Sequence, residues 1–242
     1  MILNNICIFF MGAGIFSFLN VIIYRVPKKL SFIKGRSFCP RCHTQLKFYD
    51  LIPILSYLFL RGKCRYCNKV ISIYDTINEV IGGILLLQCF KDRNGLIIFM
   101  FFCILDIISL IDIYTMEIDD KYHIIIILLS IISMFVFKLS IIDRLIGFLC
   151  VSMPMYILTL FIKDGFGGGD IKLMAVSGFF MGYQRIIVSM YIALCIGGFY
   201  SLFLIIFKDK KWNSYFAFAP FLSIGMLIGW FYGYQFLYFF IT

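Results

Sequence analysis

Long apolar runs are the sequence feature that most constrains this chain. The first run covers residues 2–24 without a charged side chain, and further runs fill most of the 242 residues. The chain is 62% hydrophobic and 14% charged, whereas soluble domains are typically about 45–50% apolar and about 25% charged. This composition excludes a soluble enzyme, a disordered chain and a secreted disulfide scaffold. It predicts an all-α polytopic membrane protein whose first run is a retained helix rather than a cleaved signal peptide.

The apolar runs predict about eight transmembrane helices with a small zinc-binding cytoplasmic loop domain. A span needs about 20 residues, and the short run at 173–182 supplies only half of that. A re-entrant segment is open there, although a crossing agrees better with the charges that follow. We expect three parts: a first transmembrane helix (1–24), a cytoplasmic zinc-binding loop domain (25–75) and a transmembrane core (76–242).

The positive charges predict the orientation, because Lys and Arg accumulate on the cytoplasmic side of membrane proteins. Eleven of the 22 Lys and Arg residues lie between residues 25 and 75. If this stretch is cytoplasmic, alternate crossings place 17 Lys and Arg inside and five outside. The outer five are Lys91, Arg93, Lys138, Arg144 and Arg185. The net charge of +9 therefore indicates a membrane orientation, and we expect a lipid bilayer and no nucleic acid as partner.

Four cysteines in the basic loop form two CxxC pairs, Cys39 with Cys42 and Cys64 with Cys67. Four thiolates at this spacing can surround Zn²⁺ tetrahedrally, and the reducing cytoplasm disfavours disulfides. We therefore expect a structural zinc site. A loop without metal, and His43 as a ligand, stay open as alternatives.

Two aspartates stand at the predicted cytoplasmic boundary. Asp112 ends an apolar run, and Asp170 follows Gly167, Gly168 and Gly169. Two facing carboxylates cannot easily both ionise, so one can activate water while the other protonates the substrate, as in aspartic proteases. The glycines would permit unusual backbone shapes and close approach of a substrate strand. Asp is also a favoured helix N-cap, so a capping role stays open for both aspartates.

Several motifs, in this order, resemble the bacterial type IV prepilin peptidases, which are membrane aspartic proteases with a GxGD motif. The motifs are Ser17-Phe-Leu-Asn-Val21, Arg25-Val-Pro27, Gly35-Arg-Ser-Phe-Cys-Pro-Arg-Cys42, Tyr49-Asp-Leu-Ile-Pro-Ile-Leu-Ser-Tyr57, Leu60-Arg-Gly-Lys-Cys-Arg-Tyr-Cys67, Glu79, Leu110-Ile-Asp112 and Gly167-Gly-Gly-Asp-Ile-Lys-Leu173. The chain departs from the family pattern at Phe16, a position that is commonly Gly.

The resemblance implies a protease that removes short basic leader peptides from type IV prepilins or pseudopilins at the cytoplasmic face of the bacterial inner membrane. It implies that Asp112 and Asp170 are the catalytic aspartates and that Glu79 is a candidate for contact with the substrate or its new amine. It also implies N-methylation of the new terminus with S-adenosylmethionine, because the zinc loop accompanies the bifunctional form.

The alternative function is a transporter or channel with a zinc-stapled cytoplasmic loop. Asp106 and Glu79 could relay ions in such a protein. However, the best candidate acids cluster at one boundary rather than at the midplane. A zinc module that only binds partners would leave Asp112 and the glycines unexplained. The sequence does not specify an oligomeric state.

Overall fold

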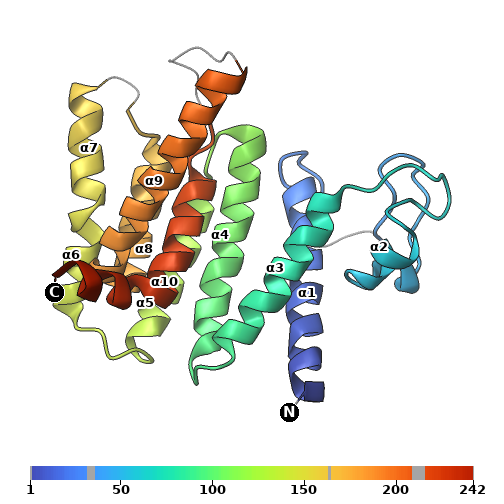
Figure 1. Ribbon diagram of the computed structural model, residues 1–242, viewed down its shortest axis with the longest axis horizontal. Helices are drawn as coiled ribbons and strands as arrows, with labels where there is room; N and C mark the ends of the chain where they lie inside the picture. Colours follow the sequence, from blue (N-terminus) through green and yellow to red (C-terminus); the bar gives the residue numbers. More distant parts are fainter. Residues whose placement is uncertain (1, 32–35, 163–164, 209–215, 242) are drawn as a thin grey trace. The chain divides into compact units, whose positions relative to one another are not determined.

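The computed structural model describes residues 2–31, 36–162, 165–208 and 216–241, and within these ranges most residues are helical, the main exception being 36–72. Apart from helices, the described residues contain only two isolated β-bridges. The all-α fold class is therefore confirmed. The elements in Figure 1 are α1 (Ile2–Arg25), the 3-10 turn η1 (Phe48–Leu51), α2 (Leu55–Phe59), α3 (Ile73–Cys89), α4 (Gly95–Thr115), α5 (Asp120–Met134), α6 (Ile141–Cys150), α7 (Ser152–Phe161), α8 (Gly168–Met181), α9 (Tyr183–Lys208) and α10 (Ala219–Ile241).

Among the described residues, four helical stretches are long and apolar enough to cross a membrane, as expected for a membrane protein. They are Leu3–Arg25, Gly95–Thr115, Ile141–Phe161 and Tyr183–Phe207. The expected number of eight is not confirmed. In particular, α8 has 14 residues, which at about 1.5 Å per residue reach only about 21 Å. A complete crossing by this segment therefore stays a prediction.

The chain forms two compact units, Met1–Cys103 and Ile104–Thr242, and the expected boundaries at residues 24 and 75 stay predictions. In the first unit α1 packs along α3 (Figure 1). Phe16 is 1% exposed, and a Cβ on Gly82 would lie 2.2 Å from its ring. The absence of a side chain at Gly82 thus makes room for Phe16, the residue that departs from the family pattern.

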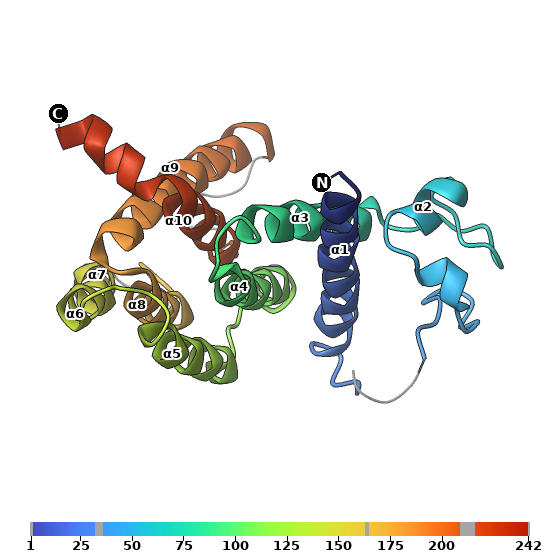
Figure 2. The ribbon, with the colours of Figure 1, turned by 90° about the horizontal axis from the view of Figure 1, so that it is seen from below.

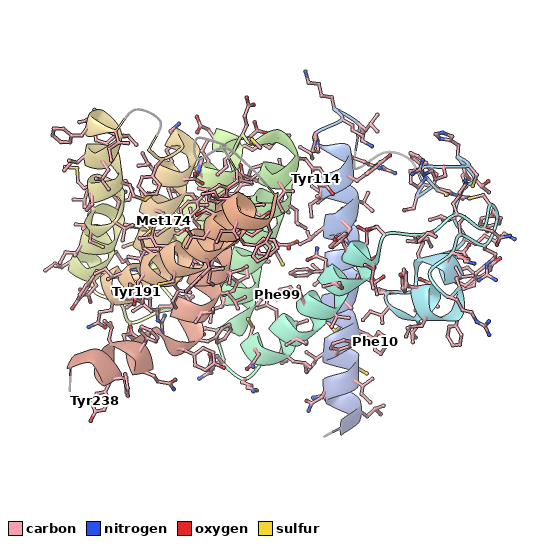
Figure 3. All side chains as sticks on the ribbon, turned by 45° about the horizontal axis from the view of Figure 1, so that its top comes forward. Phe10, Phe99, Tyr114, Met174, Tyr191 and Tyr238 are labelled. Atoms are coloured by element: carbon pink, nitrogen blue, oxygen red, sulfur yellow. The ribbon has the colours of Figure 1, made fainter. Side chains whose placement is uncertain are left out.

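In the second unit α8 is the central helix. It packs against α5, α6, α7 and α9 (Figure 2), and its Met174 is fully buried (Figure 3). A Cβ on Gly178 would lie 2.0 Å from the carbonyl oxygen of Gly147, so α8 and α6 touch through their backbones. Because other helices pack against α8 on several sides, its first turn, which carries Asp170, has a fixed position within this unit.

Arg144 lies inside α6 and not in the outer loop that we expected at 138–144. Its side chain is fully buried. The guanidinium donates to the hydroxyl of Ser133 at 2.9 Å and to the carbonyl of Phe179 at 3.2 Å. This charge links α5 and α8, so the orientation argument should not count it as a solvated loop charge. Several residues of the expected cytoplasmic loops, 32–35, 163–164 and 209–211, lie outside the described residues.

Candidate active site and metal centre

Asp112 lies in the last turn of α4 and is 6% exposed. Its Oδ2 accepts a hydrogen bond of 3.1 Å from the backbone N–H of Ala219, the first residue of α10. The helix ends just beyond, where Tyr114 is labelled in Figure 3 and the N–H of Met116 bonds to the carbonyl of Asp112 at 2.8 Å. The carboxylate is therefore anchored by another helix of the same unit and does not cap its own turn.

The glycines before Asp170 matter through space rather than through backbone conformation. Gly167 precedes α8 with an ordinary φ of −65°, and none of the three has a positive φ. A Cβ on Gly167 would lie 3.0 Å from Oδ2 of Asp170, and one on Gly169 would lie 3.0 Å from Cβ of Ile118. A Cβ on Gly168 would meet nothing within 4 Å. The expected unusual backbone is thus absent from these glycines, but Gly168 does leave the turn open.

Asp170 lies in the first turn of α8, outside the four candidate spans. Burial of the carboxyl, together with the negative charge of Asp112, raises the pKa of Asp170 to about 7. The fold therefore brings the two aspartates close enough to interact electrostatically. One of them can hold a proton near neutral pH while the other is ionised, which is the state that acid–base chemistry on a peptide bond requires.

The four predicted cysteines gather into one cluster, with all Sγ atoms within 4.8 Å of one another. Tetrahedral Zn²⁺ with Zn–S bonds of about 2.3 Å requires sulfurs about 3.8 Å apart, and the Sγ atoms of Cys39 and Cys67 are 4.0 Å apart. The donor set and its spacing therefore fit a zinc ion. His43, the alternative ligand, instead stacks its ring on Phe38 at 6.0 Å.

The two cysteine pairs are built as matching turns. The second cysteine of each pair is followed by a residue with positive φ, His43 at 57° and Asn68 at 55°. In each turn this residue donates its N–H to the carbonyl of the first cysteine, Cys39 or Cys64, at 2.9 Å. The isolated bridges Phe38–Gln45 and Lys63–Val70 close both turns. This repetition explains how two short segments can present four thiols to one point.

Glu79 belongs to the first unit and lines a cavity of about 300 Å³ together with Asp50, Tyr57 and Asp75. Its Oε2 accepts a 2.7 Å hydrogen bond from the N–H of Ile54. Ile54 has a φ of 63°, which is a strained conformation for a β-branched residue. Such strain is typical of segments that a site holds in place.

Asp50 is a second acidic residue in the lining of this cavity. Its side chain is 3% exposed and accepts hydrogen bonds from Nε of Arg65 at 2.8 Å and from the hydroxyl of Tyr66 at 2.9 Å. Burial raises the pKa of the Asp50 carboxyl, but the bonds from Arg65 and Tyr66 outweigh it and lower that pKa below its usual value. The Asp50 carboxylate is therefore ionised, but its charge is paired with that of Arg65, and Arg25 also lines the cavity.

Comparisons with known proteins agree with this geometry. Residues 98–202 match the type IV leader peptidase family, and residues 10–92 match the bacterial peptidase A24 N-terminal domain. A prepilin leader peptidase/N-methyltransferase of Vibrio cholerae is 31% identical over 186 residues, which cover 69% of this chain and 74% of the relative. The chain belongs to the type IV leader peptidase family.

Other members of the family match over more of their length. Proteins with the same name from Bacillus subtilis and Neisseria gonorrhoeae are 29% and 27% identical. The alignments cover 93% of both chains in the first case, and 91% of this chain and 86% of the relative in the second. No solved structure matched this chain. None of these comparisons favours the transporter alternative.

The sequence analysis missed three side chains that fasten the glycine-containing turn of this family member. Lys172 forms a 2.8 Å ion pair with Asp120 of α5, and Nε2 of His123 lies 3.2 Å from the carbonyl oxygen of Gly169. Nothing in the spacing of Asp120 and His123 along the sequence points to residue 169, so no sequence pattern could have identified these contacts.

Proposed function

We propose that this chain is a membrane aspartic endopeptidase that removes the basic leader of type IV prepilins or pseudopilins, with Asp112 and Asp170 as its catalytic pair. Family membership supports the reaction class. The observation that carries the residue assignment is the electrostatic interaction between the two carboxyls, which come from α4 and α8.

The proposed chemistry needs one ionised and one protonated carboxyl. The ionised carboxylate takes a proton from a water molecule, whose oxygen attacks the scissile carbonyl carbon. The protonated carboxyl gives its proton to the carbonyl oxygen, and the leaving nitrogen takes a proton as the C–N bond breaks. Gly167, Gly168 and Gly169 line the approach, where the open side at Gly168 suits an extended substrate strand.

The four cysteines are proposed to hold a structural zinc ion. A closed shell of four thiolates leaves no open position for substrate, so the ion contributes folding free energy to the loop rather than catalysis. The local turns around Cys39 and Cys64 would otherwise depend on a few backbone hydrogen bonds.

The same chain is proposed to methylate the new terminal amine. S-adenosylmethionine supplies an electrophilic methyl group when it is bound. The first unit offers a cavity of about 300 Å³, at the lower end of the usual size for small-molecule sites. The tyrosine rings in its lining suit a cationic donor, and Glu79 is the candidate contact for the amine.

The protein is proposed to lie in the bacterial inner membrane with both sites facing the cytoplasm. The basic residues between 25 and 75 support this orientation under the positive-inside rule. A prepilin leader is basic and its stem is apolar, so the leader would stay on this face while the stem enters the bilayer.

The experiment is cleavage of a purified prepilin by the detergent-solubilised protein, followed by mass spectrometry of both product ends. Asp112→Asn and Asp170→Asn should each lower kcat by about a thousandfold or more, because each removes one of the two carboxyl groups that transfer protons in the reaction. Asp106→Asn, on the same helix as Asp112, is the matched control and should cleave normally. Normal processing by either catalytic variant would refute the assignment. A methylated terminus in the presence of the donor would support the second activity.

A further inference from the structure

The start of α10 supplies a hydrogen-bond donor to the proposed active site. The carbonyl of Phe218 accepts the N–H of Leu222 at 3.2 Å, which makes Ala219 the first residue inside the helix. The first N–H groups of a helix have no partner within it. The N–H of Ala219 instead donates to Oδ2 of Asp112 at 3.1 Å, with Ala219 fully buried and Asp112 6% exposed. The backbone N–H of Ala219 therefore points at the carboxylate of Asp112 and not into its own helix.

The preceding residue contacts the segment that carries the other aspartate. The ring centroid of Phe218 lies 5.9 Å from that of Phe166, which immediately precedes Gly167 in the turn before Asp170. One turn further along α10, the hydroxyl of Ser223 lies 2.6 Å from that of Ser109 on α4. Of the two adjacent residues at the start of α10, Ala219 thus bonds to Asp112 and Phe218 contacts the segment that leads to Asp170. Ser223 fixes the register of α10 on α4.

We propose that Phe218 and Ala219 form a positioning element that sets Asp112 against Asp170 and decides which of them keeps the proton. This inference rests on the proposed function. A backbone N–H bonded to a carboxylate oxygen favours negative charge there. Asp170 also accepts a backbone hydrogen bond, from Gly167, but burial and the charge of Asp112 outweigh it and keep its proton. We therefore assign Asp112 as the base and Asp170 as the acid.

This division of roles gives a balanced reaction. Asp112 takes a proton from water as the water oxygen bonds to the scissile carbonyl carbon, and the proton of Asp170 moves to the carbonyl oxygen. When the C–N bond breaks, the amine leaves with the proton that Asp112 holds, and the hydroxyl proton returns to Asp170. The raised pKa of Asp170 agrees with its role as the acid.

The test removes the donor without removing the helix. Proline is well tolerated at the first position of a helix, where its missing N–H has no intrahelical partner, so Ala219→Pro should fold. Loss of a hydrogen bond to a charged group should lower kcat for leader cleavage by about 10- to 100-fold. KM should change little, because Ala219 bonds to Asp112 and not to the substrate. Ile141→Pro makes the same change at the first residue of α6 and should leave both constants near wild type.

Ala219→Gly restores the N–H and should recover most of the lost kcat, which a purely structural role for the alanine side chain would not predict. A wild-type kcat in Ala219→Pro would overturn the proposal, as would an equal loss in Ala219→Gly. If Ala219→Pro does not fold, Phe218→Ala decides the matter, because it should lower kcat several-fold at constant KM. Phe216→Ala, in the same aromatic cluster, should not lower kcat, and equal loss in both variants would also overturn the proposal.

The failure of this inference is distinguishable from failure of the proposed function. If Asp112→Asn abolishes cleavage while Ala219→Pro cleaves like wild type, the aspartate is catalytic and α10 does not position it. If Asp112→Asn cleaves normally, the proposed function itself is wrong, whatever Ala219→Pro does.

Discussion

The metal centre and the aspartate pair differ in how far apart the chain places their members. All four thiols come from residues 39–67, on two turns of matching geometry. The two aspartates come from α4 and α8, and the donor for Asp112 comes from α10. The first site follows from local turn geometry, whereas the second exists only when the helices of its unit have packed.

One thiol of the metal centre and one carboxyl of the aspartate pair differ in how they hold negative charge. Hydrogen bonds from Thr44 lower the pKa of the Cys42 thiol to about 6, which favours the thiolate that a metal ion needs. In the same cluster, however, a backbone hydrogen bond to the Cys67 thiol is outweighed by burial and the neighbouring thiols, which raise the pKa of Cys67 to about 11. Burial and the charge of Asp112 raise the pKa of Asp170 to about 7, which retains a proton. The turn at Cys42 thus stabilises an anion, whereas the buried carboxyl of Asp170 favours its protonated form.

Among the changes that compare the two sites, the largest effect should come from breaking the metal centre. Cys64→Ser removes one of four thiolates, and we expect metal affinity to fall by about 100-fold or more. Methyl transfer should be lost with the folded loop, since the cavity beside Glu79 includes Cys39 and Cys64 in its wall. The measurements are metal content per protein and mass of the product terminus.

Cys7→Ser is the matched control, because Cys7 is an exposed cysteine of α1 outside the cluster. It should keep its metal and both activities. Leader cleavage by Cys64→Ser should fall much less than methyl transfer, because the aspartates lie in the other unit. Equal loss of both activities would contradict the separation of the two sites.

Features that depend only on residues close together in the sequence could be predicted from it. The CxxC spacing predicts the cysteine cluster, and the apolar runs predict helices at nearly all the observed places. The prediction was wrong for Arg144, because a charged residue next to a loop looks solvated unless the hydroxyl and carbonyl groups that receive it are known. The number of spans could not be fixed, because α3, α5 and α8 are shorter than a bilayer needs.

The candidate aspartates could be named from the sequence, but their surroundings could not. Ala219 contributes through its backbone N–H, which every residue except proline has, so no side-chain pattern identifies it. His123 contacts a backbone carbonyl at Gly169, which is equally invisible in the sequence. The role of the glycines was misjudged for a related reason. Their conformation is ordinary, and what matters is which neighbouring atoms lie where a Cβ would be.

The pH dependence of cleavage tests whether Asp170 is the carboxyl that keeps its proton near neutral pH. The pKa of Asp170 is raised to about 7, so its carboxyl is mainly protonated below this pH and mainly ionised above it. If Asp170 is the acid, kcat must fall as pH rises. The protonated fraction, and with it kcat, should drop about tenfold between pH 6 and pH 8. Steady-state cleavage of a leader peptide without titrating groups in this range measures it.

His123 is the control for this profile, since an ordinary histidine also titrates near neutral pH and this one touches Gly169. His123→Gln should keep the decrease of kcat between pH 6 and pH 8, whatever its effect on the absolute rate. A kcat that rises between pH 6 and pH 8 would make Asp170 the base and contradict the assignment.

The smallest effects should come from the glycines before Asp170. Adding a methyl group there shows whether the open space serves the fold or the path of the substrate. Gly169→Ala brings a Cβ to 3.0 Å from Cβ of Ile118, so we expect a loss of about 1 kcal/mol in the free energy of unfolding and a lower kcat, because Asp170 is the next residue. Gly168→Ala has open space and should gain about 0.4–1 kcal/mol, yet its KM should rise if a substrate strand passes there.

Gly198→Ala is the matched control, because Gly198 of α9 also has nothing within 4 Å of an added Cβ. It should share the stability gain of Gly168→Ala without the change in KM. Thermal melting and steady-state cleavage of the three variants measure both quantities. If KM is the same in Gly168→Ala and Gly198→Ala, the open side of the turn is not the substrate path, and the prepilin strand must reach the aspartates from another direction.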